Sequence, residues 1–458
     1  MSVSELKAKL IPGSRVFLSG IGGVSMSSLA EMLVDRGMAV SGSDMKESSV
    51  VAQLRSRGIT VFVGQKGENI NQAQPQFIVR TAAVHDDNPE IMAARAMGIP
   101  VFERAEALGA LMEDYTHALC IAGTHGKTTT TSMATHITME AGLDPTIMIG
   151  GTLPLLGSTY RIGSGDTMVA ESCEYCNSFL SFRPTVAVIL NIEEDHLDFF
   201  KDLEHIQRSF RQFAQLVPDD GCVVANADDA NTMNALAGID RKVVTFSLEG
   251  QADYTAGGLR FEEGMGRFEL IERGRAICSV ALTVPGRHNV ANALAAAAAA
   301  RFMGIAPEVI AAGLGSYVSA DRRFQPRGQY NGADIYDDYA HHPGELQALF
   351  STARLLGYER IICAFQPHTY TRTIACFDGF TQVLTQPDIA VLMEIFPARE
   401  ENLTGISSRD LCRQIPGSIY CSTLEETEQT LRHLARPGDL ILTAGAGELN
   451  LVAGRLAE

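Results

Sequence analysis

A single glycine-rich turn restricts the fold of this chain more than any other feature. The apolar segment 118–122 leads into Gly123-Thr124-His125-Gly126-Lys127-Thr128, and a helical pattern follows over residues 129–141. Backbone N–H groups in such a turn, together with the positive end of the helix dipole, form a cradle for phosphate. A buried strand, a glycine turn and a helix in this order therefore predict a nucleotide-binding α/β domain.

Two residues of this turn have side chains suited to a bound nucleotide. Lys127 would reach the β- and γ-phosphates, and the Thr128 hydroxyl would ligate Mg²⁺. The usual form of the motif has its first glycine five residues before Gly126, where this chain has Ile121. We therefore expect a shortened form of the phosphate-binding loop.

Acidic residues and one histidine follow the next strands of the same domain. The apolar segment 167–170 ends at Glu171, and the segment 186–191 ends at Glu193-Glu194-Asp195-His196. The carboxyl ends of parallel strands meet at the ligand crevice of an open sheet. Carboxylate oxygens are the ligands that Mg²⁺ prefers. We therefore expect Glu171, Asp195 and His196 to converge on the Lys127 turn.

A second glycine turn lies near the N-terminus. The strand-like segment 15–19 leads into Gly20-Ile21-Gly22-Gly23-Val24-Ser25, and Asp44 follows the next apolar segment, 39–43. This spacing is compatible with NAD, FAD or a nucleotide sugar, or with a tight turn that binds nothing. A nicotinamide-dependent oxidoreductase is therefore one alternative, but it would leave the Lys127 turn unexplained.

The chain divides at two places where the apolar pattern lapses, near Asp114 and near Ser319. A third apolar segment, 360–365, opens onto Gln366-Pro367-His368 and a helical pattern near Phe377. Strands that alternate with helices predict parallel sheets covered by helices on both faces. A length of 458 residues suits about three domains. We expect α/β domains over residues 1–114, 115–318 and 319–458.

Composition excludes several classes of partner. The chain has 54 acidic and 37 basic residues, for a net charge of −17. Such a field repels nucleic acid and anionic membranes, so an anionic ligand needs a local positive site.

No apolar run reaches the length of about 20 residues that spans a bilayer. The first ten residues lack a signal-peptide pattern, and an odd count of nine cysteines argues against a disulfide framework. We expect a cytoplasmic protein in which Cys173 and Cys176 are reduced thiols.

Seven motifs, in this order, make the chain resemble the Mur ligases, ATP-dependent enzymes that form amide bonds in bacterial cell-wall synthesis. They are residues 20–26 (GIGGVSM), 122–131 (AGTHGKTTTT), 191–198 (NIEEDHLD), 286–292 (GRHNVAN), 322–325 (RRFQ), 337–343 (DDYAHHP) and 365–373 (FQPHTYTRT).

The resemblance implies an architecture and a reaction. It implies an N-terminal Rossmann-like domain that holds UDP, a central ATPase-like domain with a parallel sheet, and a C-terminal Rossmann-like domain that closes over the site. It implies that L-alanine is joined to the lactyl carboxylate of UDP-N-acetylmuramate through an acyl phosphate, releasing ADP and phosphate during peptidoglycan precursor synthesis. An alternative within the family is a recycling ligase whose amine is a whole tripeptide. We expect a monomer or a homodimer.

The resemblance also implies roles for single residues. The residues implied to bind ATP are Gly123, Thr124, His125, Gly126, Lys127, Thr128, Thr129, Asn289, Asn292 and Asp338. Those implied to bind the UDP substrate are Gly20, Gly22, Gly23 and Asp44. The implied Mg²⁺ ligands are Thr128, Glu171 and His196. The implied amino-acid site consists of Tyr339, His341, His368 and Arg372. The implied catalytic residues are Lys127, His196, His341 and Arg372.

The chain departs from the common family pattern at three places. Ser25 stands where a glycine is usual, and Ala340 replaces the usual glycine between Tyr339 and His341. Residues 172–176 (SCEYC) replace a more acidic segment. We expect Glu174 to take over part of the role of the missing aspartate.

Overall fold

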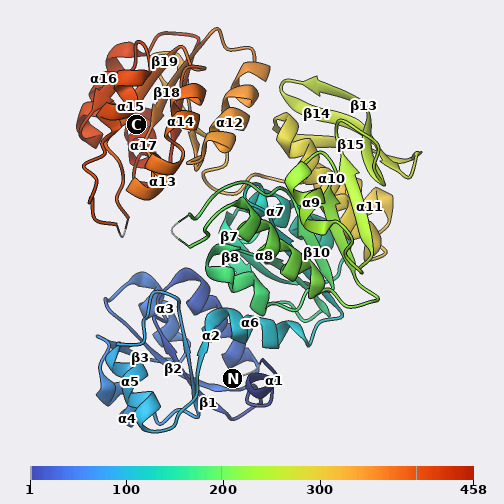
Figure 1. Ribbon diagram of the computed structural model, residues 1–458, viewed down its shortest axis with the longest axis vertical. Helices are drawn as coiled ribbons and strands as arrows, with labels where there is room; N and C mark the ends of the chain where they lie inside the picture. The colour runs from blue at the N-terminus through green and yellow to red at the C-terminus, as the bar shows by residue number, and fades with distance from the viewer. Residues whose placement is uncertain (1–2, 198, 399) are drawn as a thin grey trace.

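The computed structural model describes residues 3–197, 199–398 and 400–458. Within these residues the strands form three separate sheets, each flanked by helices (Figure 1). The α/β class with three sheet regions is confirmed. Among the residues so described, no helix has both the length and the apolar character that a membrane span requires.

The N-terminal unit is a five-stranded parallel sheet of order β3-β2-β1-β4-β5. Its strands are β1 (Arg15–Ser19), β2 (Ala39–Asp44), β3 (Thr60–Val63), β4 (Phe77–Arg80) and β5 (Val101–Glu103). Its helices are α1 (Val3–Lys7), α2 (Val24–Asp35), α3 (Ser49–Ser56), α4 (Gly67–Ala73), α5 (Pro89–Ala96) and α6 (Arg104–Met112). The first glycine turn thus joins β1 to α2, as the sequence predicts.

The middle unit contains a ten-stranded sheet of order β15-β14-β13-β12-β11-β10-β6-β9-β7-β8. Its strands are β6 (His117–Ala122), β7 (Thr146–Leu153), β8 (Ser158–Arg161), β9 (Thr167–Glu171), β10 (Val186–Ile189), β11 (Cys222–Asn226), β12 (Val243–Ser247), β13 (Tyr254–Glu262), β14 (Met265–Glu272) and β15 (Arg275–Pro285). Its helices are α7 (Lys127–Glu140), the 3₁₀ segment η1 (Tyr175–Ser181), α8 (Leu203–Gln215), α9 (Ala230–Leu236), α10 (Arg287–Phe302) and α11 (Pro307–Gly315).

The middle sheet is parallel at its centre but antiparallel at both edges. Strands β6, β9, β10, β11 and β12 pair in parallel, as expected. The hairpin β7–β8 and the run β13–β14–β15 pair antiparallel, which the sequence pattern did not reveal. In β13 and β15 more exposed and more buried residues alternate, as expected for strands with one covered face.

The C-terminal unit is a six-stranded sheet of order β16-β17-β21-β18-β19-β20, parallel except for β16. Its strands are β16 (Gln325–Tyr330), β17 (Ala333–Asp338), β18 (Arg360–Phe365), β19 (Ile389–Met393), β20 (Ile419–Cys421) and β21 (Asp439–Ala444). Its helices are α12 (Pro343–Leu355), α13 (Tyr370–Ala375), α14 (Phe377–Val383), α15 (Ser408–Gln414), α16 (Leu424–Leu434) and α17 (Asn450–Ala457).

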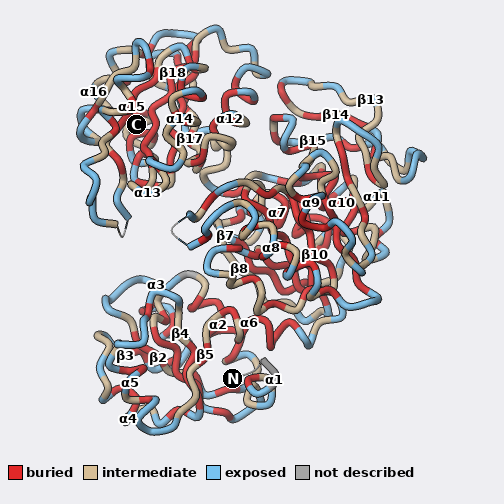
Figure 2. The backbone as a smooth tube through the Cα atoms, in the orientation of Figure 1, coloured by how far each residue is buried: buried red, intermediate tan, exposed pale blue. Residues whose placement is uncertain are grey.

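The buried segments follow the three sheets (Figure 2). One apolar core continues from the N-terminal sheet to one face of the middle sheet, and a second core fills the other face, beneath α7 and α10. Helix α6 joins the first two units closely, because a Cβ at Gly109 would lie 1.8 Å from the carbonyl oxygen of Ser181. The alanine-rich α10 is buried along most of its length, as its sequence predicts.

Candidate active site

The phosphate turn lies between β6 and α7, where two glycines have left-handed backbone conformations. Gly123 has a φ of 144° and Gly126 a φ of 83°, values that L side chains rarely adopt. A Cβ at Gly126 would also lie 2.7 Å from Oδ1 of Asn292. Helix α7 begins at Lys127, two residues earlier than the sequence pattern predicts. Lys127 and Thr128 are therefore in the first helical turn, where backbone N–H groups are free to bind an anion.

Asn191, just after β10, fixes the turn. Its Oδ1 accepts a hydrogen bond from the His125 N–H at 2.7 Å, and its Nδ2 donates to the His125 carbonyl at 3.1 Å. The Thr124 N–H donates to the Asn191 carbonyl at 3.0 Å. The ends of β6 and β10 are thereby linked, as expected for neighbouring strands of a parallel sheet.

Lys127 is paired with a buried carboxylate. Its Nζ donates to Glu174 Oε2 at 3.0 Å and to the Thr124 carbonyl at 3.0 Å. The lysine side chain is 14% exposed and that of Glu174 3%. Burial alone would lower the pKa of Lys127, but the nearby carboxylates, chiefly Glu174, raise it above its ordinary value. The lysine is therefore a permanent cation at the phosphate turn.

Two of the predicted metal ligands are in direct contact. The Thr128 hydroxyl donates to Glu171 Oε2 at 3.0 Å, and the same oxygen accepts the Gly150 N–H at 2.7 Å. The third, His196, lies with its Nε2 at 3.8 Å from Glu174 Oε1. His196 thus lies beside the Lys127–Glu174 pair, and the Thr128–Glu171 contact begins at the residue that follows Lys127. Asp198, the last residue of its motif, lies outside the described residues.

The C-terminal unit contributes an arginine to this centre. Arg372 on α13 donates from Nε to Asp195 Oδ1 at 3.0 Å and from Nη2 to Oδ2 at 3.3 Å. Burial would raise the pKa of Asp195, but His196 and Arg372 bring it well below its usual range. The predicted convergence of Asp195 and His196 on the Lys127 turn therefore includes a cation from a second unit.

The predicted amino-acid residues lie around this arginine. His368 Nδ1 is 3.2 Å from Arg372 Nη1. The ring of His341 lies 5.9 Å from that of His368 and 5.5 Å from that of Tyr339, between centroids. Burial lowers the pKa of His341, and it lowers that of His368 to about 4. His368, His341 and Tyr339 thus form a series of contacts that begins at Arg372.

His125 connects the phosphate turn to the C-terminal unit. Its Nε2 is 3.3 Å from Glu193 Oε2, and its Nδ1 is 3.3 Å from Glu345 Oε1 on α12. Burial opposes protonation, but the two carboxylates raise the pKa of His125 to about 9. Neither carboxylate was among the predicted site residues. Glu193 was noted only as part of the 191–198 motif, and Glu345 looks like an ordinary acid in the first turn of α12, which is distant in sequence.

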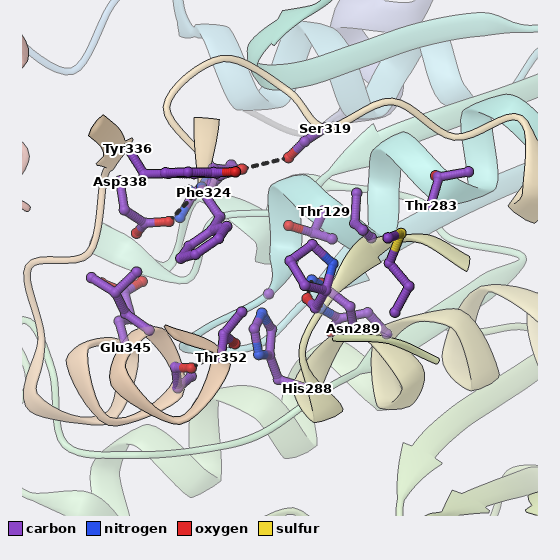
Figure 3. Close-up of a pocket in the computed structure, with 18 of the residues that line it drawn as sticks. Thr129, Thr283, His288, Asn289, Ser319, Phe324, Tyr336, Asp338, Glu345 and Thr352 are labelled. Carbon is purple, nitrogen blue, oxygen red and sulfur yellow. Dashed lines mark hydrogen bonds between the residues drawn. The ribbon is translucent and has the colours of Figure 1, made fainter. Parts of the chain in front are cut away.

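A cavity of about 450 Å³ lies between the middle and C-terminal units (Figure 3). Asp338 and Glu345 stand on one side, and Asn289 and Thr129 on the other. The Asp338 carboxylate accepts the N–H groups of Phe324 at 2.7 Å and Ala340 at 2.8 Å. Burial raises the pKa of Asp338 to about 6. Asn292 also lines the cavity. Asn289, Asn292 and Asp338, the residues outside the turn that are predicted to bind ATP, therefore all line the same cavity.

The first glycine turn lies apart from this cavity. Gly20 has a φ of 82°, and the Gly22 N–H donates to Asp44 Oδ2 at 2.9 Å. A Cβ at Gly22 would lie 2.7 Å from that oxygen, so a side chain there would displace the Asp44 carboxylate. Gly23 is the N-cap of α2. A smaller cavity of about 120 Å³ includes Ser25 from this region and Glu171 from the middle unit.

Family models match almost the whole chain. Residues 17–116 match the catalytic domain of the Mur ligase family, residues 121–300 the Mur ligase middle domain, and residues 322–447 the Mur ligase glutamate ligase domain. The chain belongs to the Mur ligase family.

Individual Mur ligases are similar over nearly their full length. UDP-N-acetylmuramate–L-alanine ligase from Acetivibrio thermocellus is 45% identical over 95% of this chain and 93% of that protein. The enzyme of the same name from Clostridium beijerinckii is 40% identical over 99% and 98%. The crystal structure of UDP-N-acetylmuramate-alanine ligase from Thermotoga maritima superposes with a TM-score of 0.78 at 27% identity, covering 96% of this chain and 98% of that one.

Membership in the Mur ligase family decides between the classes of function considered for the sequence. The expected resemblance is confirmed, and the oxidoreductase suggested by the first glycine turn has no support. Glu174 contacts Lys127 of the phosphate turn. That it takes over part of the role of the missing aspartate stays a prediction. Cys173 beside Glu174 forms no disulfide within the described residues.

Proposed function

We propose that this chain is an ATP-dependent ligase that joins L-alanine to the lactyl carboxylate of UDP-N-acetylmuramate, releasing ADP and phosphate. Relatives of that name at 40–45% identity support the reaction and its place in peptidoglycan precursor synthesis. The cytoplasmic location and the monomeric or dimeric state remain predictions.

One observation carries the proposal: two cations from different units meet at one acidic centre. Lys127 is paired with Glu174, and Arg372 with Asp195, on either side of His196. Transfer of a phosphoryl group needs positive charge fixed beside its oxygens before the reaction begins. When ATP and the carboxylate enter, both cations can exchange their carboxylate partners for phosphate oxygens.

The proposed chemistry has two steps. A lactyl carboxylate oxygen attacks the γ-phosphorus, ADP leaves, and an acyl phosphate forms. The neutral amine of L-alanine then attacks the acyl carbon, and phosphate leaves with the former carboxylate oxygen. Burial keeps the His341 imidazole neutral near pH 7, so it can accept a proton from the amine; His196 is the other candidate base. Closure of the C-terminal unit would exclude water, which would hydrolyse the acyl phosphate.

The proposed ATP site is the larger cavity and the adjoining turn. Residues 123–129 would hold the phosphates, Asn289 and Asn292 the adenine, and Asp338 the ribose. Asp338 has two backbone N–H partners that hold its carboxylate at the cavity wall, and its remaining lone pairs can accept from ribose hydroxyls.

The proposed Mg²⁺ ligands are Thr128, Glu171 and His196. A hydroxyl and a carboxylate within 3.0 Å of each other fit a hard cation that prefers oxygen. Bound there, Mg²⁺ would neutralise charge on the transferring phosphoryl group.

We further propose that residues 1–114 bind the UDP substrate through Gly20, Gly22, Gly23 and Asp44. Residues 115–318 would bind ATP. Residues 319–458 would supply the amino-acid site of Tyr339, His341, His368 and Arg372. The Asp44–Gly22 hydrogen bond fixes the shape of the turn that precedes α2.

The test is phosphate release from MgATP and UDP-N-acetylmuramate with three amines offered separately. L-alanine should support turnover, whereas D-glutamate and the tripeptide should not. Turnover with the tripeptide alone would indicate the recycling ligase instead. Absence of phosphate release with every amine would overturn the proposal.

A further inference from the structure

The smaller cavity contains an arginine that the proposed mechanism has not used. Arg104 is the first residue of α6 and lines the cavity of about 120 Å³ between the N-terminal and middle units. Helix α6 is firmly placed, because Gly109 packs directly against the Ser181 carbonyl. The position of the Arg104 backbone is therefore set by the contact between the two units.

Arg104 lacks a partner. Among the described residues it forms neither a hydrogen bond nor an ion pair. The neighbouring carboxylate, Glu103, is already engaged: it accepts from Arg80 Nε at 2.7 Å and caps α6. Burial lowers the pKa of Arg104, and the nearby Cys173 and Glu103 offset this effect only in part. Arg104 is half-buried, and its guanidinium has five donors that a ligand oxyanion in the cavity can accept.

The rest of the cavity wall suits an oxyanion. Ser25, Ser28, Thr159 and Ser178 line it. The hydroxyls of Ser28 and Ser178 already donate to backbone carbonyls, so those of Ser25 and Thr159 are the ones that can donate to a ligand. Glu171 is the carboxylate of the described lining, and its Oε2 is already held by Thr128 and Gly150. Arg104 is thus left to attract negative charge in a protein whose net charge of −17 repels it.

We propose that Arg104 binds an oxyanion of the UDP-linked acid substrate, either its diphosphate or its lactyl carboxylate. This inference rests on the proposed function. The cavity extends from α2, whose N-terminus follows the first glycine turn, to Glu171 beside the phosphate turn. A substrate that reaches from the one turn to the other must pass Arg104, which would both neutralise and orient it.

The experiment measures nucleotide binding by calorimetry, without ATP, for the wild type, Arg104→Met and Arg104→Lys. UDP-N-acetylmuramate and UDP-N-acetylglucosamine are the two probes, since the second carries the diphosphate but lacks the lactyl carboxylate. We expect Arg104→Met to weaken binding of UDP-N-acetylmuramate about 10- to 100-fold, the size of a lost charged hydrogen bond. The affinity of Arg104→Lys should lie between those of the wild type and Arg104→Met, because lysine keeps the charge but lacks the planar guanidinium.

The two probes identify the group that is bound. An equal loss for both would assign Arg104 to the diphosphate, and a loss for UDP-N-acetylmuramate alone would assign it to the carboxylate. Arg183→Met is the matched control, because Arg183 is not among the residues that line the cavity and is bound to Glu113 and to the Ser181 and Phe182 carbonyls. ATP affinity and the unfolding temperature should not change in Arg104→Met.

Two failures can be told apart. If the wild type binds UDP-N-acetylmuramate and Arg104→Met binds both probes as tightly, the role of Arg104 is refuted while the proposed function stands. If the wild type itself binds neither probe, the role of Arg104 is likewise refuted, and the proposed function is decided separately by its own test of phosphate release.

Discussion

Replacing Lys127 by alanine, alone and together with a change at Glu174, should separate the role of the lysine in catalysis from its role in stability. In Lys127→Ala, the Glu174 carboxylate, 3% exposed, loses its cation, and His196 Nε2 at 3.8 Å offers only a distant substitute. Removing one partner of a buried pair costs about 3–5 kcal/mol. Because the Lys127 side chain is itself 14% exposed, water can enter, and we expect the lower end of that range.

The loss can be measured as a melting temperature. A domain of the size of the middle unit loses about 2–4 °C per kcal/mol, so a cost of about 3 kcal/mol lowers Tm by about 6–12 °C. The double variant Lys127→Ala/Glu174→Gln removes the unpaired charge and should recover most of this loss. Neither variant should release phosphate, but both should still bind UDP-N-acetylmuramate. The exposed Lys201→Ala is the matched control and should resemble the wild type.

Two results would refute this reasoning. If Lys127→Ala melts at the wild-type temperature, the buried pair does not stabilise the middle unit. If the double variant regains phosphate release along with stability, Lys127 does not act on the phosphoryl group.

Three further changes have distinct outcomes. Arg372→Met should lower kcat about 10³-fold, as expected for a cation on the phosphoryl group, with the Kd of UDP-N-acetylmuramate unchanged by calorimetry. Glu171→Gln should raise the Mg²⁺ concentration needed for half-maximal phosphate release at least about tenfold, because the metal loses a carboxylate. The pKa of His125 is raised from 6.5 to about 9, so its stabilising contribution is complete below pH 6.5 and lost as pH rises through about 9. Between pH 6.5 and about 9, the Tm of the wild type should therefore fall more than that of His125→Gln. An equal fall of Tm in both proteins would contradict the raised pKa of His125.

Local patterns predicted the elements that position the site. The strands β1 and β18 have the expected limits, and the glycine turns join strand to helix as expected. This success has a physical cause: a glycine required at positive φ and an apolar run before it are both visible within a few residues. The start of α7 was misplaced by two residues because Lys127 and Thr128 read equally well as turn or as helix.

Contacts between distant segments could not be predicted in this way. The pairing of His125 with Glu345 depends on how α12 packs against the phosphate turn. The antiparallel strands β13–β15 have an alternating pattern that is weaker than that of a buried parallel strand. Arg104 follows an acidic residue at a helix start, which normally indicates a solvated pair, and only the packing of α6 places it in a cavity.

The central claim is that phosphate passes from ATP to the substrate carboxylate before the amide forms. UDP-N-acetylmuramate labelled with ¹⁸O in its lactyl carboxylate tests this directly, with the released phosphate analysed by mass spectrometry. An acyl phosphate predicts that each phosphate carries one oxygen from the carboxylate. Unlabelled phosphate accompanied by normal amide formation would contradict the account.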